Sequence, residues 1–183
     1  MKGQTILVML GGGGYQFETI TLLADLVEAR PDIKLVYFNT IWGPIPTESG
    51  LPEGPIYIVP EFATMVKPEG WRNIWPMIVT FFKTLYALVR YGPQLTIVVG
   101  NRHAIPMFLA ASLFGKNSVF VESITRSTMP SMTLRLLKRL NLGSLWLVQW
   151  PTVKIEHPKV MIGSIQGAAE DESTDQTERE VSA

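Results

Sequence analysis

The N-terminal region contains the stretch TILVMLGGGGYQFE at residues 5–18, and this stretch decides the fold. Residues 5–10 form a continuous apolar run, which is typical of a strand buried on both faces of a sheet. Four glycines follow the run, and residues 16–29 have the apolar spacing of a helix. The stretch therefore predicts a strand, a tight turn and a helix in succession, which is the opening unit of an α/β fold.

The glycine turn predicts a binding site for a phosphate or a diphosphate. Glycine lets the backbone approach a ligand closely, and the start of a helix offers N–H groups and the positive end of its dipole. We therefore predict that Gly12, Gly13, Gly14 and Tyr15 contact substrate. A dinucleotide fingerprint would need glycine where the chain has Gln16, and the lysine of a Walker A loop is absent. A tight turn that binds no ligand is the structural alternative.

Further apolar runs alternate with helical segments along the chain. Strands are predicted at residues 5–10, 33–38, 56–59, 95–99, 118–121 and 145–149, and helices at 16–29, 71–91, 104–114 and 129–141. This alternation predicts an α/β fold with a doubly wound, Rossmann-like parallel sheet. The folded domain is predicted to span residues 1–166. The acidic segment 167–183 has few large apolar side chains and is predicted to be a disordered tail.

The charge distribution indicates an anionic partner. The 183 residues carry 16 basic and 16 acidic side chains, so the formal net charge is zero. Residues 71–159, however, contain 11 basic and 2 acidic side chains, a net charge of +9. This excess favours phosphate or a phospholipid surface, whereas nucleic acid is disfavoured because no recognition helix or basic–aromatic strand pattern is present. The chain has no cysteine and two histidines, which excludes thiol chemistry and argues against a metal site.

Two segments of the basic region have the pattern of membrane-surface helices. In residues 71–91, a narrow stripe of Thr80, Lys83, Thr84 and Ala87 is surrounded by more large apolar side chains than one sheet face can cover. In residues 129–141, basic side chains share one helix face and apolar side chains share another. We predict that both segments contact a membrane surface. The alternatives are a fully buried helix at 71–91 and an ordinary solvated face at 129–141.

Polar side chains gather just after the predicted strands, where doubly wound sheets bind their ligands. We predict that the proton acceptor of a reaction is one of Glu18, His103 and Glu122. We also predict that substrate is bound by Asn101, Arg102, Ser123 and Arg126. The structural alternatives are an ion pair of Glu122 with Arg126 or Arg102, a structural hydrogen bond of His103, and a Glu18 that complements its helix dipole.

These motifs together resemble a known family. The pattern comprises GGGGYQFE at 11–18, a Trp-rich basic and apolar helix, GNRHAIP at 100–106, VESITR at 121–126 and VQWP at 148–151. It is similar to the membrane-recruiting subunit of the two-chain UDP-N-acetylglucosamine transferase of dolichol-linked oligosaccharide synthesis. It is equally similar to the bacterial and archaeal homologues that build polysaccharide on polyprenyl carriers. The resemblance covers roughly residues 4–165.

The resemblance implies the N-terminal, acceptor-side half of a split GT-B glycosyltransferase, with a separate donor-binding subunit as the C-terminal half. The implied reaction transfers a sugar from a UDP-sugar to a polyprenyl-diphosphate-linked acceptor, with inversion and without a cofactor or a metal. The implied location is the cytoplasmic face of the membrane, with peripheral attachment. The chain departs from the family at Tyr15, where histidine is usual, and at residues 100–103, which replace a loop of smaller side chains.

Two other functions are compatible with the sequence. A non-catalytic membrane adaptor of the same fold would recruit the donor-binding subunit without supplying a reacting group. A small nucleotide-binding oxidoreductase would use the glycine turn for its cofactor, but the incomplete fingerprint argues against it.

Overall fold

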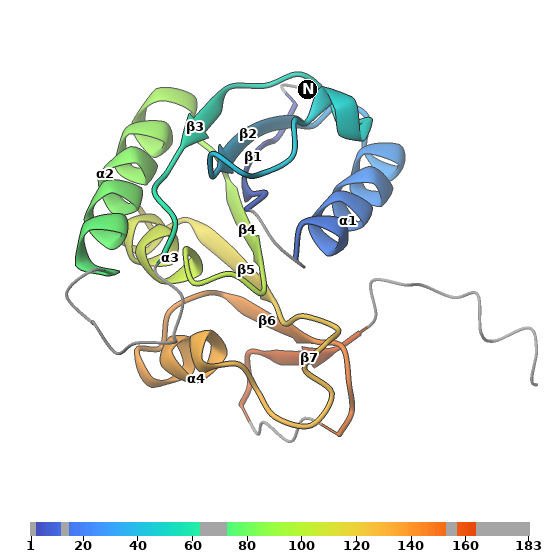
Figure 1. Cartoon of the computed structure of the whole chain (residues 1–183), viewed down its shortest axis with the longest axis vertical. Coiled ribbons are helices and arrows are strands. Elements are labelled where there is room, and N and C mark those ends of the chain that lie inside the picture. The colour runs from blue at the N-terminus through green and yellow to red at the C-terminus, as the bar shows by residue number, and fades with distance from the viewer. Residues whose placement is uncertain (1–2, 12–14, 63–72, 153–156, 164–183) are drawn as a thin grey trace, which may run out of the picture.

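The computed structural model describes residues 3–11, 15–62, 73–152 and 157–163. Within these ranges, seven parallel strands form one sheet in the order β3-β2-β1-β4-β5-β6-β7 (Figure 1). The strand order steps outward from β1 in both directions, which makes the sheet doubly wound. The predicted Rossmann-like α/β fold is therefore confirmed. The predicted acidic tail lies outside the described residues.

The strands and helices lie close to the positions that the sequence predicts. The strands are β1 (Thr5–Met9), β2 (Lys34–Asn39), β3 (Ile56–Ile58), β4 (Leu95–Val99), β5 (Asn117–Val121), β6 (Leu145–Val148) and β7 (Val160–Ile162). The helices are α1 (Tyr15–Ala29), α2 (Ile74–Tyr91), α3 (Ala104–Leu113) and α4 (Met132–Arg139), with a short 3-10 turn at Thr47–Ser49. The last strand, β7, was not predicted.

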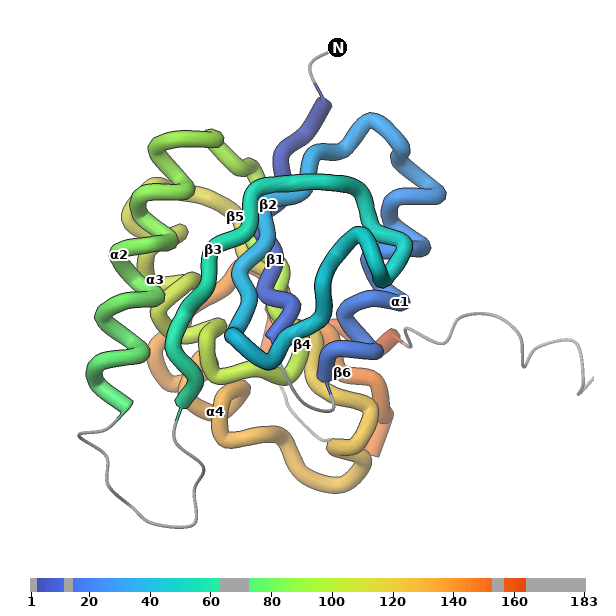
Figure 2. Tube along the Cα trace, turned by 45° about the horizontal axis from the view of Figure 1, so that its top comes forward, coloured from blue at the N-terminus to red at the C-terminus, as the bar shows by residue number. Residues whose placement is uncertain are grey.

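Helices cover the two faces of the sheet unequally. One buried cluster joins α2, α3 and α4 to the sheet around Phe38, Phe120 and Trp146. The other joins α1 to the first strands around Val8 and Leu23. Figure 1 shows α1 on one side, beside β1 and β2, and α2, α3 and α4 on the other. In Figure 2, α2 again forms the outer wall, with α3 next to it.

Helix α2 buries its small and polar side chains and exposes large apolar ones, which is the opposite of the usual amphipathic arrangement. Its small and polar stripe, which includes Thr80, Thr84 and Ala87, is buried, and α2 packs closely on α3. The Thr84 hydroxyl is satisfied within the helix, because it donates to the Thr80 carbonyl at 2.7 Å, whereas the buried Thr80 hydroxyl has no hydrogen-bond partner in the part of the chain that the structure describes. Leu88 is buried as well, but six large apolar side chains of α2 are exposed: Ile74, Trp75, Ile78, Phe82, Tyr86 and Val89. The alternative of a fully buried helix is thus wrong.

Helix α4 is short and strongly two-sided. Leu134 and Leu137 are buried against the sheet, whereas the three basic side chains of the helix, Arg135, Lys138 and Arg139, are exposed. Met132 and Leu140 are exposed as well, so part of the predicted apolar face does not enter the core. The exposed surface of α4 therefore combines positive charge with apolar side chains.

The unpredicted strand β7 is attached by contacts from distant residues. The Trp146 amide donates to the Lys159 carbonyl at 2.7 Å. The Lys159 ammonium donates to Asn141 Oδ1 at 2.7 Å and to the Gly143 carbonyl at 2.9 Å, both in the turn that follows α4. Lys159 thus fastens the edge of the sheet to the end of α4.

Candidate functional site

The loops after β1 and β4 interlock at the carboxyl edge of the sheet. Gly11 has φ +62°, and a Cβ at this position would lie 2.6 Å from Nδ2 of Asn101. Gly100 has φ +56°, and a Cβ there would lie 2.4 Å from Cδ1 of Tyr15. Each glycine therefore leaves room for a side chain from the opposite loop. The structure assigns Asn101 and Tyr15 this packing role, while the predicted ligand residues Gly12–Gly14 lie outside the described residues.

Glu18, in the first turn of α1, accepts hydrogen bonds from two other loops. Its Oε1 accepts from the Ser123 hydroxyl at 2.6 Å. Its Oε2 accepts from the Ile124 amide at 3.0 Å and from Nε2 of Gln149 at 3.1 Å. The fold thus brings together three sequence motifs, those that contain Glu18, Glu122 and Gln149. Three donors from two other loops therefore hold one partly exposed carboxylate in place.

Glu122, just after β5, is 1% exposed and bonded to backbone amides. Its Oε1 accepts from the Ser123 amide at 3.2 Å, and its Oε2 accepts from the Ser131 amide at 2.8 Å. Ser131 in turn caps α4, because its hydroxyl accepts from the Leu134 amide at 3.1 Å. The expected ion pair of Glu122 with Arg126 or Arg102 is not what holds this carboxylate. The residues after β5 fold back, so backbone N–H groups reach it first.

His103 is 2% exposed and joins the loop after β4 to the segment after β3. Its Nδ1 lies 2.7 Å from Oδ1 of Asn101, and its Nε2 lies 3.0 Å from the Pro60 carbonyl. Burial lowers the pKa of His103 to about 4, and the Pro60 carbonyl partly opposes this shift by favouring a protonated ring. The ring of Phe62 also packs edge-on against the imidazole. Both ring nitrogens thus face internal oxygens.

Because the His103 imidazole is buried, we predict that acid destabilises the folded protein. Its pKa is about 4 in the folded state against 6.5 ordinarily, so only the unfolded chain binds this proton between those values. Stability should therefore fall by up to about 3 kcal/mol as the pH is lowered from 6.5 to 4. Urea unfolding across this range measures the effect. His103→Gln should lose less stability than the unsubstituted chain over the same interval, and parallel curves for the two proteins would contradict the assignment.

The remaining predicted ligands differ in how they are presented. Ser123 is buried and gives its hydroxyl to Glu18, so it shapes the loop. Arg126 is exposed on the same loop, and Arg102 is half-buried after β4. Trp150 Nε1 donates to the Ile124 carbonyl, and the Thr152 hydroxyl donates to the Ser127 carbonyl. The segment around Arg126 is thus tied down from the residues that follow β6.

Sequence reasoning missed Gln149 as a site residue. The side chain is 7% exposed, and Nε2 also donates to the Glu122 carbonyl at 2.8 Å. Its motif, VQWP, was noted in the sequence, and a polar residue directly after a buried strand is the signal that could have identified it.

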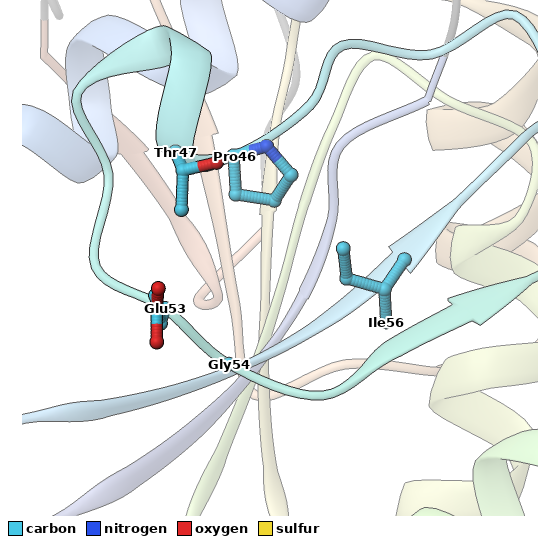
Figure 3. A pocket seen from close by; sticks show the side chains of 5 residues that line it. All are labelled: Pro46, Thr47, Glu53, Gly54 and Ile56. Carbon is cyan, nitrogen blue, oxygen red and sulfur yellow. The ribbon is translucent and has the colours of Figure 1, made fainter.

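A concavity of about 470 Å³ lies away from this polar site (Figure 3). It is lined by Pro46, Thr47, Glu53, Gly54 and Ile56, which lie around the entry to β3 and hence at the amino edge of the sheet. No candidate site residue lines it. In the part of the chain that the structure describes, no three histidine or acidic side chains gather in a way that could hold a metal ion. None of the described helices has the length and hydropathy needed to cross a bilayer.

Comparison with known proteins gives two sequence relatives and a close structural match. The chain is 27% identical over 182 residues to the human UDP-N-acetylglucosamine transferase subunit ALG14, which covers 88% of this chain and 82% of that protein. It is 26% identical over 133 residues to the UDP-N-acetylglucosamine--N-acetylmuramyl-(pentapeptide) pyrophosphoryl-undecaprenol N-acetylglucosamine transferase of Moorella thermoacetica. This match covers 69% of the chain but 34% of the bacterial protein. No family model matches.

Among solved structures, the fold matches MurG of Acinetobacter baumannii with a TM-score of 0.68 and 15% sequence identity. The match covers 90% of this chain and 47% of the MurG chain. The chain thus spans about half of that structure and about a third of the bacterial transferase. These matches confirm the resemblance that the sequence motifs indicated.

Proposed function

We propose that this chain is the acceptor-side subunit of a two-chain glycosyltransferase. The complete enzyme would transfer N-acetylglucosamine or a related sugar from its UDP-sugar to a sugar carried on polyprenyl diphosphate, with no other cofactor. The observation that carries the proposal is the similarity to a transferase subunit along most of both chains. The fold also matches about half of the MurG structure. The donor-binding half is proposed to be a second chain, because the relative that this chain matches along most of its length is named as a subunit.

One face of the sheet is only partly covered by helices, and this supports the proposal of a second chain. Register places Val119, Leu145, Leu147 and Met161 on the side of the sheet where α1 lies. These side chains are half-buried or exposed and belong to neither buried cluster. Helix α1 packs on β1, β2 and β4, whereas β6 and β7 lie two and three strands beyond β4 in the sheet (Figure 1). Because strands of parallel sheets are normally covered on both faces, the donor-binding subunit is proposed to pack here.

The acceptor diphosphate is proposed to bind at the carboxyl edge of the sheet. Arg126 is exposed on a loop held by hydrogen bonds, and Arg102 follows the adjacent strand. Guanidinium groups bind phosphate oxygens strongly, and Gly12, Gly13 and Gly14, which lie outside the described residues, are proposed to contact the diphosphate as well. The residues of this chain thus bind and orient the acceptor.

The exposed surfaces of α2 and α4 are proposed to contact the membrane that holds the lipid acceptor, from its cytoplasmic side. The apolar side chains of α2 would enter the boundary between headgroups and acyl chains. The basic side chains of α4 would attract anionic headgroups. Peripheral contact of this kind would bring the acceptor to the enzyme while the polyprenyl chain stays in the bilayer.

A second candidate role is that this chain also supplies the proton acceptor. Among the three predicted candidates, Glu122 and His103 are buried and their polar atoms face internal partners. Glu18 is partly exposed, which favours it as the group that a substrate could reach. Its two carboxylate oxygens, however, already accept three hydrogen bonds from this chain, so binding and positioning remain the roles that the geometry supports best.

Reconstitution with the donor-binding subunit and a polyprenyl-linked acceptor tests the proposal. The isolated chain should show no transfer, and transfer should appear when the second subunit is added. Glu18→Gln should raise the acceptor KM and lower kcat by less than about tenfold, because its main loss is hydrogen bonding. A fall of about 100-fold or more at saturating acceptor would identify Glu18 as the base. Glu28→Gln, at an exposed position on the same helix, is the matched control.

A further inference from the structure

Gln149 occupies a junction of three strand ends. It follows β6, and its Nε2 donates both to Oε2 of Glu18 at 3.1 Å and to the Glu122 carbonyl at 2.8 Å. One buried carboxamide therefore connects the exit of β6, the exit of β5 and the first turn of α1. Because the carboxamide NH2 group has two hydrogens, a single side chain can hold both acceptors at once.

Glu18 connects Gln149 to the 122–131 loop, which we define as residues Glu122 to Ser131. One carboxylate oxygen accepts from the Ser123 hydroxyl, and the other accepts from the Ile124 amide and from Gln149. Glutamate has several rotatable bonds, so its carboxylate needs fixed partners to stay in one orientation. Gln149 is a partner that does not belong to the loop itself. It can therefore orient the carboxylate toward Ser123 and Ile124.

The 122–131 loop is held at both of its ends and presents its middle to solvent. Glu18 anchors the start of the loop, and Glu122 anchors its end through the Ser131 amide at 2.8 Å. Between these anchors, Thr125 and Arg126 are exposed. A loop that is already ordered loses less conformational entropy when it binds a ligand.

We propose that Gln149 is a positioning residue that, through Glu18, sets the conformation of the 122–131 loop for binding a diphosphate. The inference rests on the proposed function, in which Arg126 of this loop contacts the acceptor diphosphate. Gln149 does not touch the substrate in this scheme. Its effect is on acceptor affinity, and the donor site on the second subunit is independent of it.

Gln149→Leu removes the hydrogen bonds to Glu18 and to the Glu122 carbonyl and keeps a side chain of similar size. In the reconstituted complex, it should raise the acceptor KM about tenfold and leave kcat and the donor KM within about twofold. Calorimetry with inorganic pyrophosphate should show a similar loss of affinity, without any need for turnover. Gln94→Leu is the matched control, because Gln94 also makes two hydrogen bonds, with the Thr5 amide and the Gly92 carbonyl, at the amino edge of the sheet. It should change neither value.

A double-substitution cycle tests whether Gln149 acts through Glu18. Glu18→Ala should weaken pyrophosphate binding, and adding Gln149→Leu to it should cause little further loss. Additive losses would overturn the inference, as would an unsubstituted protein that does not bind pyrophosphate. A complex that transfers no sugar but shows the non-additive loss would contradict the proposed function and support the inference. A complex in which Gln149→Leu transfers sugar with normal turnover and a normal acceptor KM would contradict the inference and support the proposed function.

Discussion

Vesicle binding should fall about 100-fold or more when Trp75 and Phe82 are both replaced by glutamate, because each aromatic ring contributes an apolar surface worth about 1.5–3 kcal/mol on full burial. The two side chains are 65% and 62% exposed on the outer face of α2. Glutamate at these positions removes the apolar contact and adds a charge that the interface of a bilayer disfavours. Folding should change little, because neither ring is part of a buried cluster. Sedimentation with vesicles that contain phosphatidylglycerol measures the loss.

Ile41→Glu is the control for this experiment. Ile41 is 71% exposed in the segment after β2, so one glutamate replaces an exposed apolar side chain outside α2, where the double variant introduces two in α2. Its vesicle binding should remain close to that of the unsubstituted chain. If the double variant of α2 still sediments with vesicles as well as the control does, α2 is not the membrane-contacting surface.

Gly100→Ala should destabilise the fold by about 2–5 kcal/mol, because a positive φ costs an L residue about 1–2 kcal/mol and overpacking adds about 1–3 kcal/mol. The added methyl group would lie 2.4 Å from Cδ1 and 2.7 Å from Cε1 of Tyr15. Tyr15 is half-buried and is the first residue of α1, so a shift of its ring away from the added methyl group would disturb the start of this helix. The midpoint of urea unfolding gives the free-energy difference.

Gly115→Ala separates the backbone cost from the steric clash. Gly115 has φ +61°, close to the φ of +56° at Gly100, but a Cβ there would meet nothing within 4 Å. We expect this variant to lose only about 1–2 kcal/mol. In a Tyr15→Ala background, Gly100→Ala should cost no more than Gly115→Ala does. Equal losses for the two single variants in the unsubstituted background would show that Tyr15 is not wedged against Gly100.

The arrangement of the sheet could be predicted because its strands are continuous apolar runs that must be covered on both faces. Strand β7 could not be predicted in this way. It has three residues, and its place depends on the Trp146 amide and on the contacts of Lys159 with the turn after α4. Such contacts form only when segments far apart in the sequence meet, and local periodicity does not record them.

The sequence pattern did not indicate which face of α2 is buried, because Thr80 and Thr84 count as polar in such a pattern. In the structure, the Thr84 hydroxyl bonds to its own helix, and these small side chains lie at a close helix interface. The candidate site shows the same kind of limit. Position after a strand predicted that Glu18 and Glu122 would gather at one edge, but only the folded chain shows that backbone amides and Gln149 bind their oxygens.

The interlocked loops also constrain protein engineering. Residues 15 and 100 fill one space between them, and residues 11 and 101 fill another. A mutant library that randomises Tyr15 or Asn101 alone can therefore sample only side chains that fit over an unchanged glycine. Varying each pair jointly removes the steric clash at the glycine and leaves only the backbone cost of its positive φ, about 1–2 kcal/mol, so the pair and not the single residue is the useful unit of diversification.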